Sequence, residues 1–138
     1  MKSTLISLLL LFISTSVLAK NLTLKKQKKI IDHIAKEVRK EYYITGHGEV
    51  VTGTPTVMTK KELVNFYFDL KSNPYPEETL TSKEVSSLFR CHYSKSCALW
   101  YFGSSAEYWG GFGTSEHFIL LNIKNGKNKH ISFVSYAE

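Results

Sequence analysis

The chain has 138 residues, of which 43% are hydrophobic and 22% are charged, and its formal net charge is +6 at pH 7. This composition indicates a globular protein and excludes an intrinsically disordered one, which would have fewer apolar residues. The positive charge is concentrated in residues 20–40, which hold eight basic and two acidic residues, whereas residues 41–138 hold nine basic and ten acidic residues. The basic segment suits an acidic protein, an anionic lipid or an anionic envelope polymer, unless it is only a solvated helix face.

Residues 1–19 predict a secretory signal peptide. Lys2 supplies a positive start, an apolar stretch follows from residue 5 to residue 18, and Val17 and Ala19 match the small-residue pattern that signal peptidase recognises. The apolar stretch is shorter than the about 20 residues that a membrane span needs. We therefore expect residues 1–19 to be cleaved and residues 20–138 to form a single globular domain without a transmembrane segment. In a bacterium the mature protein should reach the periplasm. The alternative is a signal anchor that stays uncut.

Residues 23–44 predict an amphipathic helix, because apolar residues recur at three- and four-residue spacing along one stripe. Thr23 is the expected N-cap, and Gly46 and Gly48 are expected to end the helix. The residues of the apolar stripe are Ile30, Ile31, Ile34, Ala35, Val38 and Tyr42. The lysines lie mostly off this stripe, so they should face the solvent.

Two shorter helices are predicted next, and each begins with the sequence pattern of a capping box, at Thr59–Glu62 and at Thr81–Glu84. The first should end before Asn73-Pro74, and the second at about Arg90. A loop over residues 72–78, which contain two prolines, should separate them.

Strand-like sequence dominates the rest of the chain. The extended runs are residues 49–58, with an edge or break at Pro55, and residues 98–102, 107–113, 117–124 and 129–136. Asn125-Gly126 joins the last two runs and is a strong hairpin signal. The run 117–124 is apolar on both faces, so it should be the central strand, with helices covering one side. The predicted fold class is α+β, with N-terminal amphipathic helices packed on a C-terminal antiparallel β-sheet.

Cys91 and Cys97 are the two cysteines of the chain, and export to an oxidising compartment predicts a disulfide between them. The loop that it closes is short, so the chain-entropy model gives a contribution of roughly 2–2.5 kcal/mol. A metal site is not expected, because only His92 lies close in sequence and there is no second cluster of ligands.

The five histidines have no recognised metal-binding spacing. His47, near Glu49 in a glycine-flanked segment, is the best candidate for a general base, while Ser115, Glu116 and His117 could be combined into a catalytic set. No serine lies in the pattern of a nucleophile elbow, and both thiols are expected to be oxidised. We therefore expect no enzyme activity and no cofactor. A small secreted hydrolase that uses His47 or His117 as its base is the third-ranked alternative.

The segment from Trp100 to Gly113 has the most unusual composition, with six aromatic residues and four glycines in fourteen positions. It could be a hairpin whose rings pack in the core, a protein-binding surface or a surface that stacks on sugar rings. The residues expected to contact a protein partner are Trp100, Tyr101, Tyr108, Trp109 and Phe112, with the Cys91–Cys97 loop alongside them. The residues expected to add electrostatic steering are Lys25, Lys28, Lys29 and Lys36.

A small exported domain with one short disulfide and no clear active site resembles, in this profile and not in any motif, the periplasmic immunity proteins of bacterial antagonism systems. That resemblance implies a protein that binds and occludes a toxin acting on the cell wall or membrane. The expected partner is a toxin or hydrolase in the periplasm, not nucleic acid, and a homodimer is an open alternative. A cell-envelope module that binds glycan or anionic polymer is the main rival function.

Overall fold

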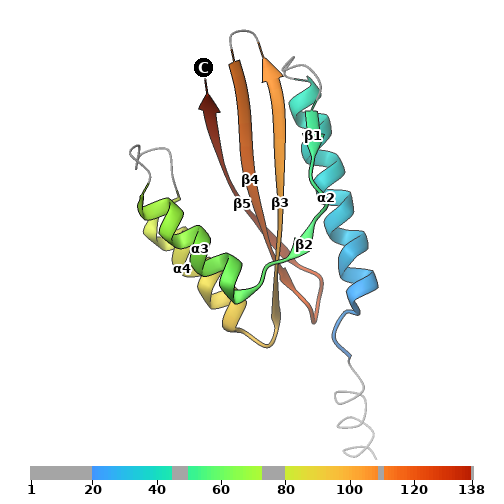
Figure 1. The fold of residues 1–138 in the computed structure, drawn as a ribbon. Helices are drawn as coiled ribbons and strands as arrows, with labels where there is room; N and C mark the ends of the chain where they lie inside the picture. The colour runs from blue at the N-terminus through green and yellow to red at the C-terminus, as the bar shows by residue number, and fades with distance from the viewer. Residues whose placement is uncertain (1–19, 45–49, 73–79, 109–110, 138) are drawn as a thin grey trace, which may run out of the picture.

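The computed structural model describes residues 20–44, 50–72, 80–108 and 111–137, with the backbone alone for residues 42–44, 107–108, 111–112 and 134–137. The elements are, in chain order, α2 (Leu24–Ile44), β1 (Val50–Thr52), β2 (Thr56–Val57), α3 (Lys60–Lys71), α4 (Ser82–Tyr93), β3 (Cys97–Tyr108), β4 (Gly111–Asn122) and β5 (Asn128–Ala137). The predicted α+β class is confirmed, because the helices pack on an antiparallel sheet of five strands (Figure 1).

The helix starts lie where the sequence predicts them. The backbone N–H of Lys26 donates to Thr23 Oγ1 at 3.3 Å, which caps α2. Both predicted capping boxes are formed, at Thr59 before α3 and at Thr81 before α4. α3 ends at Lys71, as expected, whereas α4 continues to Tyr93, past its predicted end. The extra turn of α4 places Cys91 on the buried face of the helix.

β3 and β4 form a hairpin of twelve residues in each strand. Their register pairs Cys97 with Asn122 at one end and Tyr108 with Gly111 at the other. The sequence predicted two separate extended runs here, because the small residues 103–106 have little strand propensity. These residues nevertheless belong to β3, since β4 pairs with them on one side and β1 pairs with residues 104–106 on the other.

β4, predicted to be the central strand, is one of two interior strands and lies between β3 and the edge strand β5. The strand order is β1-β3-β4-β5, and the short β2 also pairs with β3. The predicted turn at Asn125-Gly126 joins β4 to β5, and Gly126 has a φ of 77°, a backbone conformation that favours glycine.

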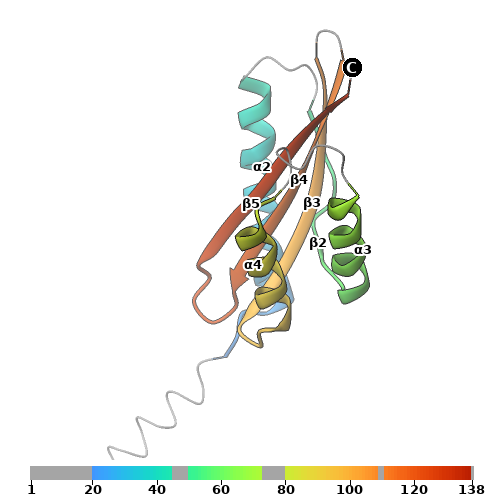
Figure 2. The ribbon, with the colours of Figure 1, turned by 90° about the vertical axis from the view of Figure 1, so that its left-hand side faces the viewer.

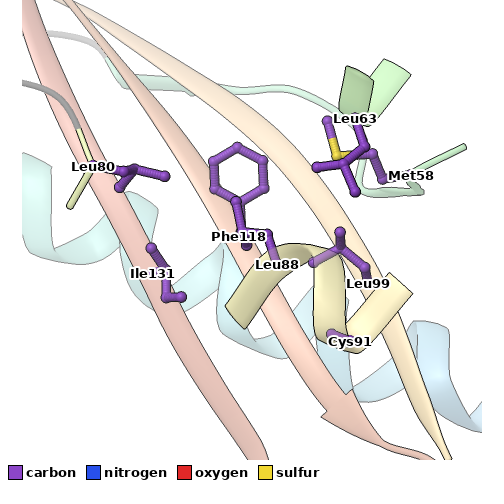
Figure 3. Packing of buried hydrophobic residues seen from close by; sticks show 8 residues of the cluster. All are labelled: Met58, Leu63, Leu80, Leu88, Cys91, Leu99, Phe118 and Ile131. Atoms are coloured by element: carbon purple, nitrogen blue, oxygen red, sulfur yellow. The ribbon is translucent and has the colours of Figure 1, made fainter. Parts of the chain in front are cut away.

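Helices cover both faces of the sheet, and not one side as the sequence suggested. α2 packs on one face, and α3 and α4 pack on the other (Figures 1 and 2). The reason lies in β4, where Phe118 and Ile119 are both fully buried and, as neighbours in a strand, point to opposite faces. The buried cluster under α3 and α4 is shown in Figure 3 and consists of Met58, Leu63, Leu80, Leu88, Cys91, Leu99, Phe118 and Ile131. The cluster under α2 consists of Ile31, Ala35, Val38, Trp100, Phe102, Ile119 and Leu121.

Cys91 and Cys97 form the predicted disulfide, which ties the last turn of α4 to the first residue of β3. Their Cα atoms lie 5.1 Å apart. Inside the loop, the backbone N–H of Ser96 donates to Ser94 Oγ at 3.2 Å. The disulfide therefore fixes a loop that local hydrogen bonds already shape.

We expect the double variant Cys91→Ser, Cys97→Ser to fold and to lose roughly 2–2.5 kcal/mol of unfolding free energy, because the closed loop is short. Urea denaturation of the oxidised protein and of the variant measures this loss. The reduced wild-type protein is the control and should unfold with the variant. Two free thiols in denatured, non-reduced protein taken from an oxidising compartment would contradict the disulfide.

Candidate functional site

A cluster of polar side chains lies on the face of the sheet that α2 covers. It comprises Ser104 on β3, Ser115 and His117 on β4, and His130 on β5, and we call it the serine–histidine cluster. The register brings these residues together, because Ser104 pairs directly with Ser115 while β5 places His130 opposite Ile119, one step along the same face from His117. Three strands therefore contribute to one site.

The side chains of the serine–histidine cluster are hydrogen-bonded to one another. His117 Nε2 lies 2.7 Å from Ser115 Oγ and 3.2 Å from Ser104 Oγ, and the two serine hydroxyls are also hydrogen-bonded. On the other side of the ring, His117 Nδ1 lies 2.9 Å from His130 Nε2. No buried side-chain nitrogen or oxygen in the described part of the chain lacks a hydrogen-bond partner. The cluster thus satisfies its own polar groups.

Burial keeps the His117 imidazole neutral. The pKa of His117 is lowered to about 4, mainly by burial and also by the neighbouring His130, because two positive rings would repel each other. The imidazole stacks on the ring of Phe102, with centroids 4.8 Å apart and planes inclined by 11°. His130 is exposed overall, but its Nε2 atom lies against the His117 ring. Desolvation lowers the pKa of His130, whereas the Glu41 carboxylate acts to raise it.

The order Ser115, His117, His130 has the connectivity of a nucleophile, a base and an orienting group. The set is closed to substrate, however, because Ser115 is only 3% exposed and His117 only 2% exposed. The geometry therefore suits a structural network that fixes the register of β3, β4 and β5 beneath α2.

The structure corrects the catalytic set that the sequence offered. Ser115 and His117 do meet, but Glu116 lies on the opposite face of β4, where it accepts a hydrogen bond from the Tyr101 hydroxyl. Burial raises the pKa of Tyr101, and its hydrogen bond to Glu116 raises it further, so the phenol stays protonated. His47, the other candidate base, lies outside the described residues. Sequence reasoning missed Ser104 and His130, which join the cluster only through the strand register.

The five residues predicted to contact a partner lie in different surroundings. Trp100 is 5% exposed and packs in the cluster under α2, where its indole N–H donates to Gln27 Oε1 at 3.1 Å. Tyr101 is half-buried on the other face of the sheet. Tyr108 and Phe112 lie at the end of the β3–β4 hairpin, with side chains outside the described part, and Trp109 lies outside the described residues altogether.

Relative to the predicted surface Trp100–Gly113, the Cys91–Cys97 loop is close in the chain to Trp100 and lies at the other end of β3 from the hairpin end. Cys97 begins β3, and Tyr108 ends it, so the whole strand separates them (Figure 1). At about 3.4 Å per residue, a strand of this length spans roughly 35–40 Å. The loop contacts the opposite end of the sheet instead, where the Ile123 N–H donates to the Ser96 carbonyl at 3.0 Å.

The basic residues of α2 lie on its outer side. Ile31, Ala35 and Val38 are buried against the sheet, whereas all seven basic residues between Lys25 and Lys40 are exposed. Lys25, Lys28, Lys29 and Lys36, the residues predicted to steer a partner, are therefore accessible to solvent, while their steering role stays a prediction.

Two hollows in the surface lie away from the serine–histidine cluster. One, of about 380 Å³, lies between α3 and α4 and is lined by Tyr67, Leu70, Lys71, Leu80, Ser82, Val85 and Ser86. The other, of about 480 Å³, lies beside the disulfide and is lined by Ser87, Arg90, Cys91, Ser94, Cys97 and Leu120. Among the described residues, neither lining includes a histidine or a carboxylate.

The fold and its closed polar cluster define an α+β protein whose sheet is covered by helices on both faces. The sequence matches no known family, and no curated protein or solved structure is significantly similar to it. In the described part of the chain, no helix has the length and apolar character needed to cross a membrane. The same residues contain no group of three or more histidine, cysteine, aspartate or glutamate side chains placed to hold a metal ion.

Proposed function

We propose that this protein is an exported binding protein that inhibits a partner protein, and that the partner is a bacterial toxin acting on the cell wall or membrane. The chain would then be a periplasmic immunity protein, released by cleavage after Ala19. Binding, rather than catalysis, is supported by the closure of the serine–histidine cluster, whose groups bond to one another beneath α2. The Cys91–Cys97 disulfide supports export, because such bonds are typical of oxidising compartments.

The observation that carries the proposal is the position of the aromatic, glycine-rich segment. β3 and β4 bring the C-terminal part of this segment to one end of the sheet, where Tyr108 pairs with Gly111, away from α3 and α4 (Figure 1), whereas Trp100 lies in the first half of β3. β5 supports the same end, because Ala137 pairs with Phe112. A hairpin held by ladders on two sides loses little conformational entropy when it enters a partner's cleft. Occlusion by this hairpin end is therefore the mechanism that we propose.

The substitution Trp109→Ala tests the proposed surface. We expect it to weaken partner binding by more than about 2 kcal/mol, as for an interface anchor, with an unchanged melting temperature. The partner is first captured by cross-linking in periplasmic extract, and the affinities of the purified pair are then measured by titration calorimetry. Tyr93→Ala is the matched control, because Tyr93 is a 62% exposed aromatic residue within the Cys91–Cys97 loop, at the other end of β3 from the hairpin end. This control should bind like the wild type.

The measurement separates two outcomes. If Trp109→Ala lowers the melting temperature strongly and the folded fraction binds with wild-type affinity, the aromatic segment is scaffold and the occlusion mechanism is wrong. If Tyr93→Ala weakens binding while Trp109→Ala does not, the partner binds the disulfide end instead.

The exposed basic side of α2 favours a second candidate function, an envelope module that binds an anionic polymer. The double variant Lys28→Glu, Lys29→Glu should then release the protein from sedimented peptidoglycan carrying anionic polymer. Lys60→Glu, Lys61→Glu is the matched control, because it reverses two exposed lysines on α3. For an inhibitor, the α2 variant should instead mainly slow association with the toxin and reduce its salt dependence. If neither double variant changes the amount of protein that sediments with the peptidoglycan, the envelope-module function is wrong.

A further inference from the structure

The two edges of the sheet differ in length and continuity. On one edge, β3 is covered by β1 and β2, which have three and two residues and are separated by a segment that contains Pro55. Short, interrupted strands leave few backbone groups free for another chain, and they are a common protection of a sheet edge. On the opposite edge, β5 has ten residues, without proline and with Lys129 as its one formally charged residue. This edge lacks those protections.

Alternate residues of β5 direct their backbone groups away from the sheet. The Asn122 N–H donates to the Lys127 carbonyl at 2.7 Å where the β4–β5 ladder begins. Since hydrogen-bonded pairs alternate along an antiparallel ladder, Ile131 bonds to β4, whereas the N–H and C=O groups of His130 and Ser132 face outward. Within the described ranges, the backbone of β5 pairs with β4 alone.

The helices leave this edge accessible. The buried sheet residues under α2 come from β3 and β4, whereas the cluster under α3 and α4 also includes Ile131 of β5. These two helices therefore cover one face of β5, while its residues His130 and Ser132 are exposed. Figure 2 looks toward the β5 side of the molecule and shows β5 between α2 on one side and the pair α3 and α4 on the other, with α4 drawn in front of the sheet next to the lower part of β5. A strand added next to β5 would therefore extend the sheet between the two helical layers.

We infer that β5 is a homodimer interface, at which β5 of a second copy pairs antiparallel and joins the two sheets into one. A strand placed antiparallel to itself is self-complementary, because a two-fold axis presents the same outward donors and acceptors from both copies. Pairing between β5 and the opposite edge of another copy would give an open filament, but β1 and β2 are too short and interrupted for such a ladder. Pairing between two β5 strands therefore gives a closed dimer and not a filament. This interface does not depend on the proposed toxin.

Ser132→Pro tests the interface without breaking the fold. Proline removes an N–H that points away from β4 and fills its place with the ring, so the β4–β5 ladder keeps its hydrogen bonds. We expect a wild-type dimer in light-scattering chromatography, and a dissociation constant at least roughly tenfold higher in Ser132→Pro, because one hydrogen bond is lost from each copy. Ser132→Ala, which keeps the N–H and replaces an exposed side chain, is the control and should dimerise like the wild type.

Amide exchange of the wild-type protein gives a second readout that does not depend on the folding of any variant. The amides of His130 and Ser132 should exchange more slowly at high than at low protein concentration, whereas those of Val50 and Thr52 on the other edge should not change. A wild-type protein that is monomeric at high micromolar concentration would overturn the inference. So would a dimer that Ser132→Pro leaves intact, or protection of the β5 amides only when another protein is bound.

Discussion

Trp100→Ala should lower the free energy of unfolding by about 3–5 kcal/mol, which is the range expected when a buried aromatic side chain is replaced by alanine. This is a large part of the about 5–15 kcal/mol that holds a typical domain folded, and it should lower the melting temperature by roughly 10–20 °C. Urea denaturation followed by far-ultraviolet circular dichroism measures the effect without relying on the fluorescence of the residue removed.

The size of this effect follows from the two kinds of contact that Trp100 makes. Its ring packs with Ile31 of α2 and Ile119 of β4 in the cluster under α2, so truncation leaves a cavity. Its indole N–H donates to Gln27, a residue of α2 that is 6% exposed and in turn donates to the Leu22 carbonyl at 2.9 Å. Truncation therefore also leaves the Gln27 amide oxygen buried without its donor, at a cost of about 1–3 kcal/mol that overlaps with the cavity term.

Two matched variants separate the contributions of packing and hydrogen bonding at Trp100. Trp100→Phe keeps most of the apolar bulk and removes the donor, so it should cost less than Trp100→Ala. Adding Gln27→Met to Trp100→Phe replaces both polar partners by apolar groups and should recover part of the loss. A Trp100→Ala protein that melts like the wild type and fails to bind its partner would show instead that Trp100 is a surface anchor.

Features that depend on neighbouring residues could be predicted from the sequence. The caps at Thr59 and Thr81 and the turn at Asn125-Gly126 each need only a few adjacent residues, and each is present. The disulfide could also be predicted, because the chain has only two cysteines. In these cases local backbone chemistry decides the structure.

Features that depend on the strand register could not be predicted. Trp100 and Gln27 are 73 residues apart, and nothing local to either shows that they meet. Ser104 reaches His117 only because β3 and β4 pair in one register, and a shift by one residue would turn His117 to the other face. An aromatic, glycine-rich composition is compatible with both core and surface, so it could not separate buried Trp100 from the rest of its segment.

The stability of the protein should fall as the pH is lowered from about 6.5 to about 4, because His117 must stay neutral in the folded state. Its folded pKa is about 4, below the about 6.5 of an unfolded histidine, so the unfolded chain binds more protons in this range. Unfolding therefore becomes easier as the pH falls through this window, and the loss is complete below the folded pKa. The shift corresponds to a loss on the order of 3 kcal/mol between neutral pH and pH values below 4.

His117→Gln isolates this contribution, because glutamine can hydrogen-bond to Ser115 and does not titrate. The variant should be less stable than the wild type at neutral pH, since it loses the stacking on Phe102, but the difference should shrink as the pH approaches 4. The comparison uses urea denaturation at several pH values, in which carboxylates shared by both proteins cancel. His33→Gln, on the exposed side of α2, is the control and should follow the wild-type curve. Parallel curves for the wild type and His117→Gln would mean that a protonated His117 is tolerated beneath α2, and that the serine–histidine cluster opens to solvent.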